Sequence, residues 1–344
     1  MLKRVLKVLF VIVGSFVGAG FASGQEIYTF FYIYNYKGII GIIISSLLIG
    51  TVIYKTIELC RIYGIDNYKE FLEIFIKNKQ GIEIFNNIIN IFILVTFFIM
   101  VAGFGAYFEQ QLKIDNLIGS SIISVICLLV FINDISGLVK VNEYLVPILI
   151  ICLVIVGTNV IDFKYVGDFF RSREEFKCGK WILDSVLYSG YNIILLIPVL
   201  ISIKKFVKNK KENLIISILT VAGIIFLGIM VFCMLTQIDI NINNLEMPVV
   251  YIASKKSEIY EKLYGIVILS SILTTSVSLG TGLLKNICVK SKKQYLKISI
   301  LICLTSIIVS NIGFAKLINL LYPIFGYIGI MQIIKLIFLK ITDI

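Results

Sequence analysis

The sequence predicts an all-α polytopic membrane protein with about ten transmembrane helices. Three observations support this fold class. Hydrophobic residues make up 58% of the 344 residues, the mean hydropathy is +0.97, and long apolar runs recur from one end of the chain to the other. Only 15% of the residues are charged, which is well below the share of about 25% in soluble proteins. Lipid is therefore the expected solvent, and the cell membrane is the expected location.

The spans follow from the thickness of the bilayer. A membrane helix needs about 20 mostly apolar residues, because each residue adds about 1.5 Å against a hydrocarbon core of about 30 Å. By this measure the spans cover residues 5–34, 38–60, 82–111, 117–132, 137–160, 180–206, 214–236, 260–287, 295–309 and 315–339. We expect one transmembrane domain, residues 1–344, in which residues 5–160 and 180–340 form two halves.

The formal net charge of +11 has a topological explanation. Lys and Arg gather in short segments between the apolar runs, notably residues 204–211 and 285–297, and most of them are cytoplasmic if both termini are cytoplasmic. The connection after the fifth span is an exception, because residues 164–180 place several basic residues on the predicted outer side. The distribution fits the positive-inside rule better than a nucleic-acid-binding surface, so we expect no nucleic-acid partner.

Two connections are predicted to contain helices. Residues 67–77 carry apolar side chains at helical spacing, which is typical of an amphipathic helix lying along the inner membrane surface. Residues 245–255 include Pro248 near their start and predict a short outer helix that could act as a lid. A plain structural connector is the alternative in both cases.

No residue pattern indicates an enzyme. The chain has no histidine, and none of its seven cysteines forms a C-x-x-C pair, so we expect neither a zinc site nor a disulfide framework. It also lacks a P-loop and a G-x-S-x-G motif. We therefore predict a protein that is not an enzyme and has no cofactor. Any proton coupling must use carboxylates, Lys or Tyr.

The most informative feature is a glycine-rich interruption of the first span. Residues 14–26 read GSFVGAGFASGQE. Irregular backbone at membrane depth is costly unless it lines a cavity, and glycine tolerates the dihedral angles of an unwound segment. We therefore predict a helix break that presents free N–H groups to a solute carboxylate. A packing seam between helices is the alternative, because Gly-x-x-x-Gly spacing occurs here twice.

Two further spans carry polar sequences. In the sixth span, residues 184–192 read DSVLYSGYN. Interruptions at corresponding positions of two five-helix halves indicate an inverted-repeat transporter with a binding site at the bilayer midplane, although a simple kink at Ser189 and Gly190 is the alternative. In the eighth span, residues 270–278 read SSILTTSVS, which suits either a Na⁺ site or hydroxyls bonded within the bundle.

Glu26 is the acid nearest to the predicted break. An ionisable residue inside a membrane helix is a functional candidate, but Ser23 and Glu26 also have the spacing of a capping box, in which the carboxylate only satisfies a helix start. Asp184 of the sixth span could face the same vestibule. The two acids would then form a cation-binding pair or a gate.

The first-span motif VGSFVGAGFASGQE, residues 13–26, resembles the first-helix signature of the YkvI-like bacterial membrane proteins. That family is similar to the amino acid–polyamine–organocation transporters with the LeuT-type fold. The resemblance implies a five-plus-five inverted repeat with helices one and six unwound around a solute. It also implies an ion-coupled symporter of a small polar solute, an amino acid or related zwitterion, that works by alternating access. A non-transporting sensor on the same scaffold is the alternative.

The resemblance implies two sets of site residues. The solute is expected at Gly18, Ala19, Gly20, Ser23, Glu26, Tyr188, Ser189, Tyr191 and Asn192. In this set, residues 18–20 stand where such transporters bind a carboxylate, and the ammonium group is expected at Glu26 or at carbonyls of residues 188–192. One Na⁺ is expected between the carbonyls and hydroxyls of Gly14, Val17, Ser271, Thr274 and Thr275. The expected partners are the solute and the lipid bilayer, and the sequence predicts no particular oligomeric state.

Overall fold

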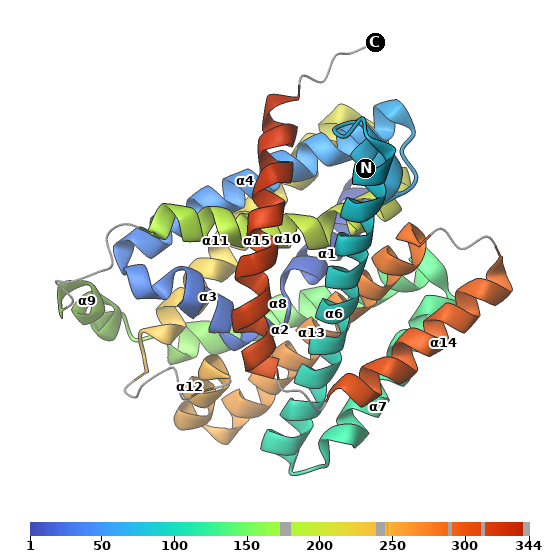
Figure 1. Ribbon diagram of the computed structural model, residues 1–344. Helices are drawn as coiled ribbons and strands as arrows, with labels where there is room; N and C mark the ends of the chain where they lie inside the picture. Colours follow the sequence, from blue (N-terminus) through green and yellow to red (C-terminus); the bar gives the residue numbers. More distant parts are fainter. Residues whose placement is uncertain (173–179, 239–244, 246, 288–290, 311–313, 340–344) are drawn as a thin grey trace.

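The computed structural model describes residues 1–172, 180–238, 245, 247–287, 291–310 and 314–339. Within these ranges the chain is almost entirely helical and contains no strand (Figure 1). Six of the described helices are long and apolar enough to cross a membrane, and two shorter apolar helical stretches, Asn116–Ile132 and Tyr322–Phe338, accompany them. The predicted all-α polytopic membrane fold is confirmed.

The ten predicted spans correspond to observed helices. The first span comprises α1 (Leu2–Phe16), α2 (Ala19–Ser23) and α3 (Gln25–Phe30), and a 3-10 turn at Tyr32–Tyr34 follows it. Each remaining span is one helix: α4 (Tyr36–Tyr63), α6 (Lys79–Leu112), α7 (Asn116–Ile132), α8 (Asp134–Val160), α10 (Trp181–Ile203), α11 (Lys210–Leu235), α13 (Glu258–Asn286), α14 (Lys292–Val309) and α15 (Phe314–Phe338). The connections contain α5 (Tyr68–Glu73), α9 (Phe163–Ser172), a 3-10 turn at Lys204–Phe206 and α12 (Pro248–Lys256).

Short polar residues begin several of these helices. The side chains of Asn67, Asn78, Asn209, Ser257 and Ser291 each accept a hydrogen bond from a backbone N–H in the first turn of the helix that follows. Such caps satisfy N–H groups that have no partner inside the helix. The apolar runs between the caps then form the spans, so the sequence places the ends of these helices directly.

Two helices form the centre of the bundle. The most apolar stretch of α10 is 94% buried inside the bundle, and that of α13 is 83% buried. The corresponding share is 39% for α8 and for α11. The helix α10 packs against α4 and α15, while α13 packs against α6 and α8. The first span contacts both α10 and α13. A break in the first span therefore lies between the two most buried helices.

Both described ends of the chain lie at the same end of the bundle (Figure 1). Arg4 at the start of α1 forms an ion pair of 2.6 Å with Glu212 at the start of α11. At the same end, Lys55 Nζ donates hydrogen bonds to carbonyls in the last turn of α15, the closest at 2.7 Å. The connecting helices α9 and α12 lie toward the opposite end. This arrangement is the one expected for an even number of crossings.

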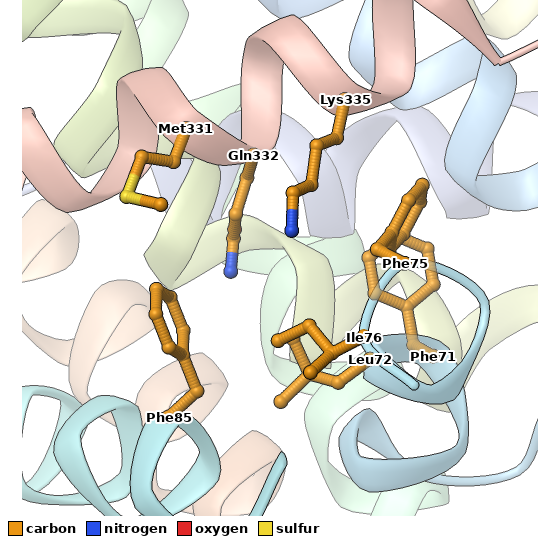
Figure 2. A pocket seen from close by; sticks show the side chains of 8 residues that line it. All are labelled: Phe71, Leu72, Phe75, Ile76, Phe85, Met331, Gln332 and Lys335. Atoms are coloured by element: carbon orange, nitrogen blue, oxygen red, sulfur yellow. The ribbon is translucent and has the colours of Figure 1, made fainter. Parts of the chain in front are cut away.

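Part of the predicted amphipathic helix in residues 67–77 is present as α5, and its apolar face turns toward the other helices. Tyr68, Phe71 and Leu72 are at most 2% exposed, because this face packs into the bundle. Beside α5, side chains from α5, α6 and α15 line a small pocket (Figure 2): Phe71, Leu72, Phe75, Ile76, Phe85, Met331, Gln332 and Lys335. The predicted outer helix is present as α12.

The sixth span differs from its prediction, because α10 is one uninterrupted helix through residues 184–192. Two local reasons are visible. A methyl group on Gly190 would overlap the backbone of Gly326 in α15, so this glycine serves a close helix-helix contact. The Ser189 hydroxyl donates to the carbonyl of Ser185 at 2.9 Å, within its own helix. The predicted unwinding of the sixth span is therefore wrong, and Gly190 serves the contact between α10 and α15.

Candidate functional site

The first span breaks where the glycine-rich motif predicts a break. The helix α1 ends at Phe16, Gly18 is extended with φ −84° and ψ −176°, and α2 begins at Ala19. A second break follows at Gly24, whose φ of +88° lies in the left-handed region that glycine adopts without strain. Residues 16–24 are all buried, so the irregular backbone faces protein and not lipid. The predicted break is confirmed.

The break frees carbonyl oxygens of α1. In a continuous helix the Gly18 N–H would bond the Gly14 carbonyl, but here it donates to the Phe16 carbonyl at 2.9 Å. The Gly14 carbonyl instead accepts a hydrogen bond of 3.0 Å from the Thr275 hydroxyl of α13. The same hydroxyl lies 3.4 Å from the Val17 carbonyl. One threonine thus joins both carbonyls at the break.

Two other residues predicted to hold Na⁺, Ser271 and Thr274, lie one turn away on α13. The Thr274 hydroxyl donates to the Ser271 carbonyl at 3.1 Å, within its own helix, and both residues are fully buried. Of the five predicted residues, the described hydrogen bonds bring Gly14, Val17 and Thr275 together. Neutral oxygen ligands of this kind suit a hard cation. Among the described residues, no group of His, Cys, Asp and Glu could hold a metal ion.

The break approaches α13 and α8 closely. A methyl group on Gly18 would lie 3.4 Å from the Thr275 hydroxyl, and one on Gly14 would lie 2.6 Å from a methyl carbon of Val146 in α8 and overlap the Asn142 amide. Small residues at these positions let the backbones come together. The two interpretations of the glycine motif thus hold at once, because the helix breaks at a tightly packed seam.

Glu26 turns into the bundle and does not cap a helix. The helix α3 begins after Gly24 without a side-chain cap, and the Ser23 hydroxyl donates to the Gly20 carbonyl at 3.1 Å. The Glu26 carboxylate instead accepts a hydrogen bond of 2.5 Å from the Tyr191 hydroxyl of α10. Its side chain lies over Gly20, where an added methyl group would be 2.8 Å from Glu26 Cγ. The capping-box alternative is therefore not what the structure shows.

Asp184 does not share this position with Glu26. The Tyr34 hydroxyl donates a hydrogen bond of 2.5 Å to the Asp184 carboxylate, at the first turn of α10. Seven residues separate Asp184 from Tyr191, and this spacing corresponds to about 10 Å along a helix. The two acids thus meet different tyrosines at different depths and do not form a pair.

Tyr191, the partner of Glu26, belongs to a group of six aromatic side chains whose rings contact one another, and we refer to them as the aromatic cluster: Phe16, Phe30, Phe31, Tyr188, Tyr191 and Tyr322. The Tyr188 ring lies edge-on to Phe31 with centroids 4.8 Å apart, and Tyr191 stacks on Tyr322 at 4.5 Å. The Tyr188 hydroxyl is buried and has no hydrogen-bond partner among the described atoms. The cluster joins the first, sixth and tenth spans.

Several predicted site residues face elsewhere. The Ser189 hydroxyl reaches the Ser45 carbonyl of α4 at 3.3 Å, and the Asn192 amide donates to the Tyr188 carbonyl at 2.9 Å. Ala19 is buried at the start of α2. Conversely, sequence reasoning missed Tyr322, Phe30 and Phe31, because aromatic residues in an apolar span look like ordinary core. A phenol at mid-span, as at Tyr322, was the available signal.

These features define a helical membrane protein with a LeuT-type fold, in which a broken first span faces the eighth. Solved structures share this fold. A Na⁺-coupled sialic acid symporter aligns over 98% of this chain and 79% of its own, with 14% identity and a TM-score of 0.73. The structure of MhsT in complex with L-phenylalanine aligns over 95% of this chain and 87% of its own, with 14% identity and a TM-score of 0.67. A manganese transporter of Eremococcus coleocola aligns over 96% of this chain and 74% of its own, with 16% identity and a TM-score of 0.61.

Sequence relatives match over nearly the full length. The membrane protein YkvI of Bacillus subtilis (strain 168) is 27% identical over 341 residues, which cover 93% of this chain and 92% of YkvI. The protein YyaD of the same organism is 24% identical in an alignment 353 positions long. This alignment covers 98% of this chain and 97% of YyaD. No protein-family model matches the chain. The resemblance to YkvI-like membrane proteins, first indicated by residues 13–26, is confirmed.

Proposed function

We propose that this protein is a secondary active transporter, an ion-coupled symporter that moves a small polar solute by alternating access. The solute class that fits the resemblance is an amino acid or a related zwitterion, and the coupling ion is Na⁺. One observation carries the proposal. The Thr275 hydroxyl meets the freed carbonyls of Gly14 and Val17, so that α13 and the broken first span share one oxygen-lined position.

The broken first span supplies a physical link between ion and solute. The ion position involves the carbonyls of Gly14 and Val17, and Glu26 lies over Gly20 only a few residues further along the same segment. An ion that holds this backbone in its broken form also holds Gly20 and Glu26 in place. Binding of either ligand then favours the conformation that binds the other, and this reciprocity is the thermodynamic condition for coupling.

Two of the solved structures support the same class of activity. The sialic acid symporter is Na⁺-coupled, and MhsT binds L-phenylalanine. Both align over nearly all of this chain. On this basis we assign residues 5–160 and 180–340 to two repeats that rock against each other. We place the protein in the cell membrane with both termini in the cytoplasm.

Contacts at the two ends of the bundle would have to open in turn. At the end that holds the N-terminus, Arg4 pairs with Glu212 at 2.6 Å and Lys7 with Glu143 at 2.9 Å. At the other end, the Gln25 amide donates to the Leu245 carbonyl ahead of α12. The described contacts close both ends around Glu26, which is 4% exposed.

Uptake into proteoliposomes tests the proposal. We expect an inward Na⁺ gradient to stimulate uptake of at least one member of a panel of amino acids and betaines. Replacing Thr274 and Thr275 together by Ala should remove the stimulation, whereas Thr305→Ala, at a half-buried position of α14 where the hydroxyl bonds only its own helix, should not. Absence of Na⁺ stimulation, or a double variant that behaves like the wild type, contradicts the ion site. Binding without flux would identify the alternative, a sensor.

A further inference from the structure

The Glu26 carboxylate is a buried acid without a basic partner. It is 4% exposed, and among the described residues no Lys or Arg forms an ion pair with it. The helix α10 contains no Lys or Arg, and the first span contains none after Lys7. A carboxylate at membrane depth is costly to leave unpaired. The site therefore favours a ligand that brings a positive charge.

Other acceptors for a positive group are scarce. The carbonyls of residues 188–192 bond N–H groups of the continuous α10, and the Tyr188 carbonyl also accepts from the Asn192 amide at 2.9 Å. The carbonyls of Gly14 and Val17 face Thr275 on the α13 side. The acceptors proposed for an ammonium group were Glu26 and the carbonyls of residues 188–192. Of these, the Glu26 carboxylate is the one that remains available beside the aromatic cluster.

The structure offers little to a solute carboxylate. The helix α2 is only five residues long, so few peptide dipoles align toward Gly18. The Glu26 side chain already lies over Gly20, within 2.8 Å of an added methyl group. A carboxylate placed against residues 18–20 would therefore meet a second carboxylate. Like charges at such a distance repel each other strongly where water is excluded.

The aromatic cluster suits a cation. Tyr191, which donates to Glu26 at 2.5 Å, stacks on Tyr322 with centroids 4.5 Å apart. Tyr188 lies edge-on to Tyr191 at 5.4 Å and to Phe30 at 5.5 Å. Faces of aromatic rings attract ammonium groups, and the attraction grows when water is excluded. Rings that a bound ligand parts from these contacts would add to the attraction of the carboxylate without requiring a negative group on the solute.

We propose that this site recognises its solute through one ammonium group, held by Glu26 inside the aromatic cluster, and that it requires no carboxylate on the solute. The favoured ligand is a small monovalent amine with a compact apolar body. The inference rests on the proposed solute site and replaces the zwitterion proposed for it by an amine that lacks the carboxylate. When the amine binds, its N–H groups take Glu26 as acceptor beside the Tyr191 hydroxyl.

Matched pairs of ligands test this inference. Thermal unfolding of the purified protein, at constant Na⁺, gives apparent affinities for phenethylamine against phenylalanine, isoamylamine against leucine, and isobutylamine against valine. We expect the amine of at least one pair to bind about tenfold more tightly than its carboxylate-bearing partner. Glu26→Gln should weaken amine binding at least about tenfold. The control Asp184→Asn, an acid paired with Tyr34, should leave the preference unchanged.

Several results overturn the inference. The inference is overturned if the carboxylate-bearing compound binds more tightly in every pair. It is also overturned if the Glu26→Gln variant still prefers amines to their carboxylate-bearing partners. If Glu26→Gln abolishes a pH dependence of uptake but keeps the amine preference, the carboxyl carries a proton and the inference is wrong. Failure of all six compounds to shift unfolding at millimolar concentration also contradicts it. Because the readout is binding, the result does not depend on flux, and absence of transport would instead contradict the proposed function.

Discussion

The first and sixth spans carry similar polar, glycine-containing sequences, yet only the first leaves the helical path. In the first span, backbone groups freed near Gly18 find a partner on another helix, because the Thr275 hydroxyl reaches the Gly14 carbonyl at 3.0 Å. In the sixth span, the Ser189 hydroxyl and the Asn192 amide bond back to carbonyls of α10 itself. A span breaks at membrane depth where a neighbour satisfies the freed groups, and otherwise stays helical.

The glycines of the two spans differ for the same reason. Gly24 has a positive φ that a residue with a side chain rarely adopts, and Gly20 leaves room for the Glu26 side chain. Gly190 is helical and lets the backbone of α15 approach, where a methyl group would overlap Gly326. Glycines of the first span therefore shape a site, whereas Gly190 shapes an interface. Substitutions should separate the two roles.

The largest effect is expected for Gly20→Ala. The added methyl group would displace the Glu26 side chain, now 2.8 Å from that position at Cγ, so solute binding should fall by about tenfold or more. The midpoint of thermal unfolding should change little, because Glu26 can turn aside. Uptake and ligand-induced stabilisation measure the effect. The control is Gly223→Ala on α11, where an added methyl group meets nothing within 4 Å. Solute binding equal to the wild type would remove Gly20 and Glu26 from the site.

An intermediate effect, on stability, is expected for Gly190→Ala. Overlap with the Gly326 backbone forces α10 and α15 apart, and overpacking of this kind costs about 1–3 kcal/mol. Chemical denaturation in detergent measures the loss of unfolding free energy. Uptake per folded molecule should fall less than in Gly20→Ala, because the Glu26 to Tyr191 hydrogen bond does not itself involve α15, although Tyr191 also stacks on Tyr322 of that helix. A variant as stable as the wild type but unable to bind solute would restore the sixth-span break.

The smallest effect is expected for Ser189→Ala. Its hydroxyl bonds the Ser185 carbonyl at 2.9 Å and the Ser45 carbonyl at 3.3 Å, so its loss removes hydrogen bonds to carbonyls that keep other partners. We expect destabilisation of about 1 kcal/mol or less and unchanged solute affinity. The same unfolding and binding assays apply. A tenfold loss of affinity at constant stability would show that Ser189 contacts the solute after all.

Much of the fold could be predicted from the sequence, because length and hydropathy limit where spans can lie and because Asn and Ser caps mark helix starts such as Asn78 and Ser291. The first-span break was predictable from its glycines next to Ser23 and Glu26. Whether a polar segment breaks depends on partners from distant parts of the chain, and the continuous α10 shows that local composition does not contain this information. Tyr322 joined the aromatic cluster through tertiary packing alone, for the same reason.

The proposed coupling mechanism depends most on the oxygen-lined position between the first-span break and α13. Direct binding of ²²Na⁺ to the purified protein tests whether an ion binds there. We predict saturable binding of one ion per chain that K⁺ does not displace. It should be lost in Thr275→Val, which keeps the shape of the side chain but removes the hydroxyl that reaches Gly14 and Val17. Thr305→Val, whose hydroxyl bonds only its own helix, should bind like the wild type. Equal ²²Na⁺ binding by wild type and Thr275→Val, or no binding by either, would contradict the account.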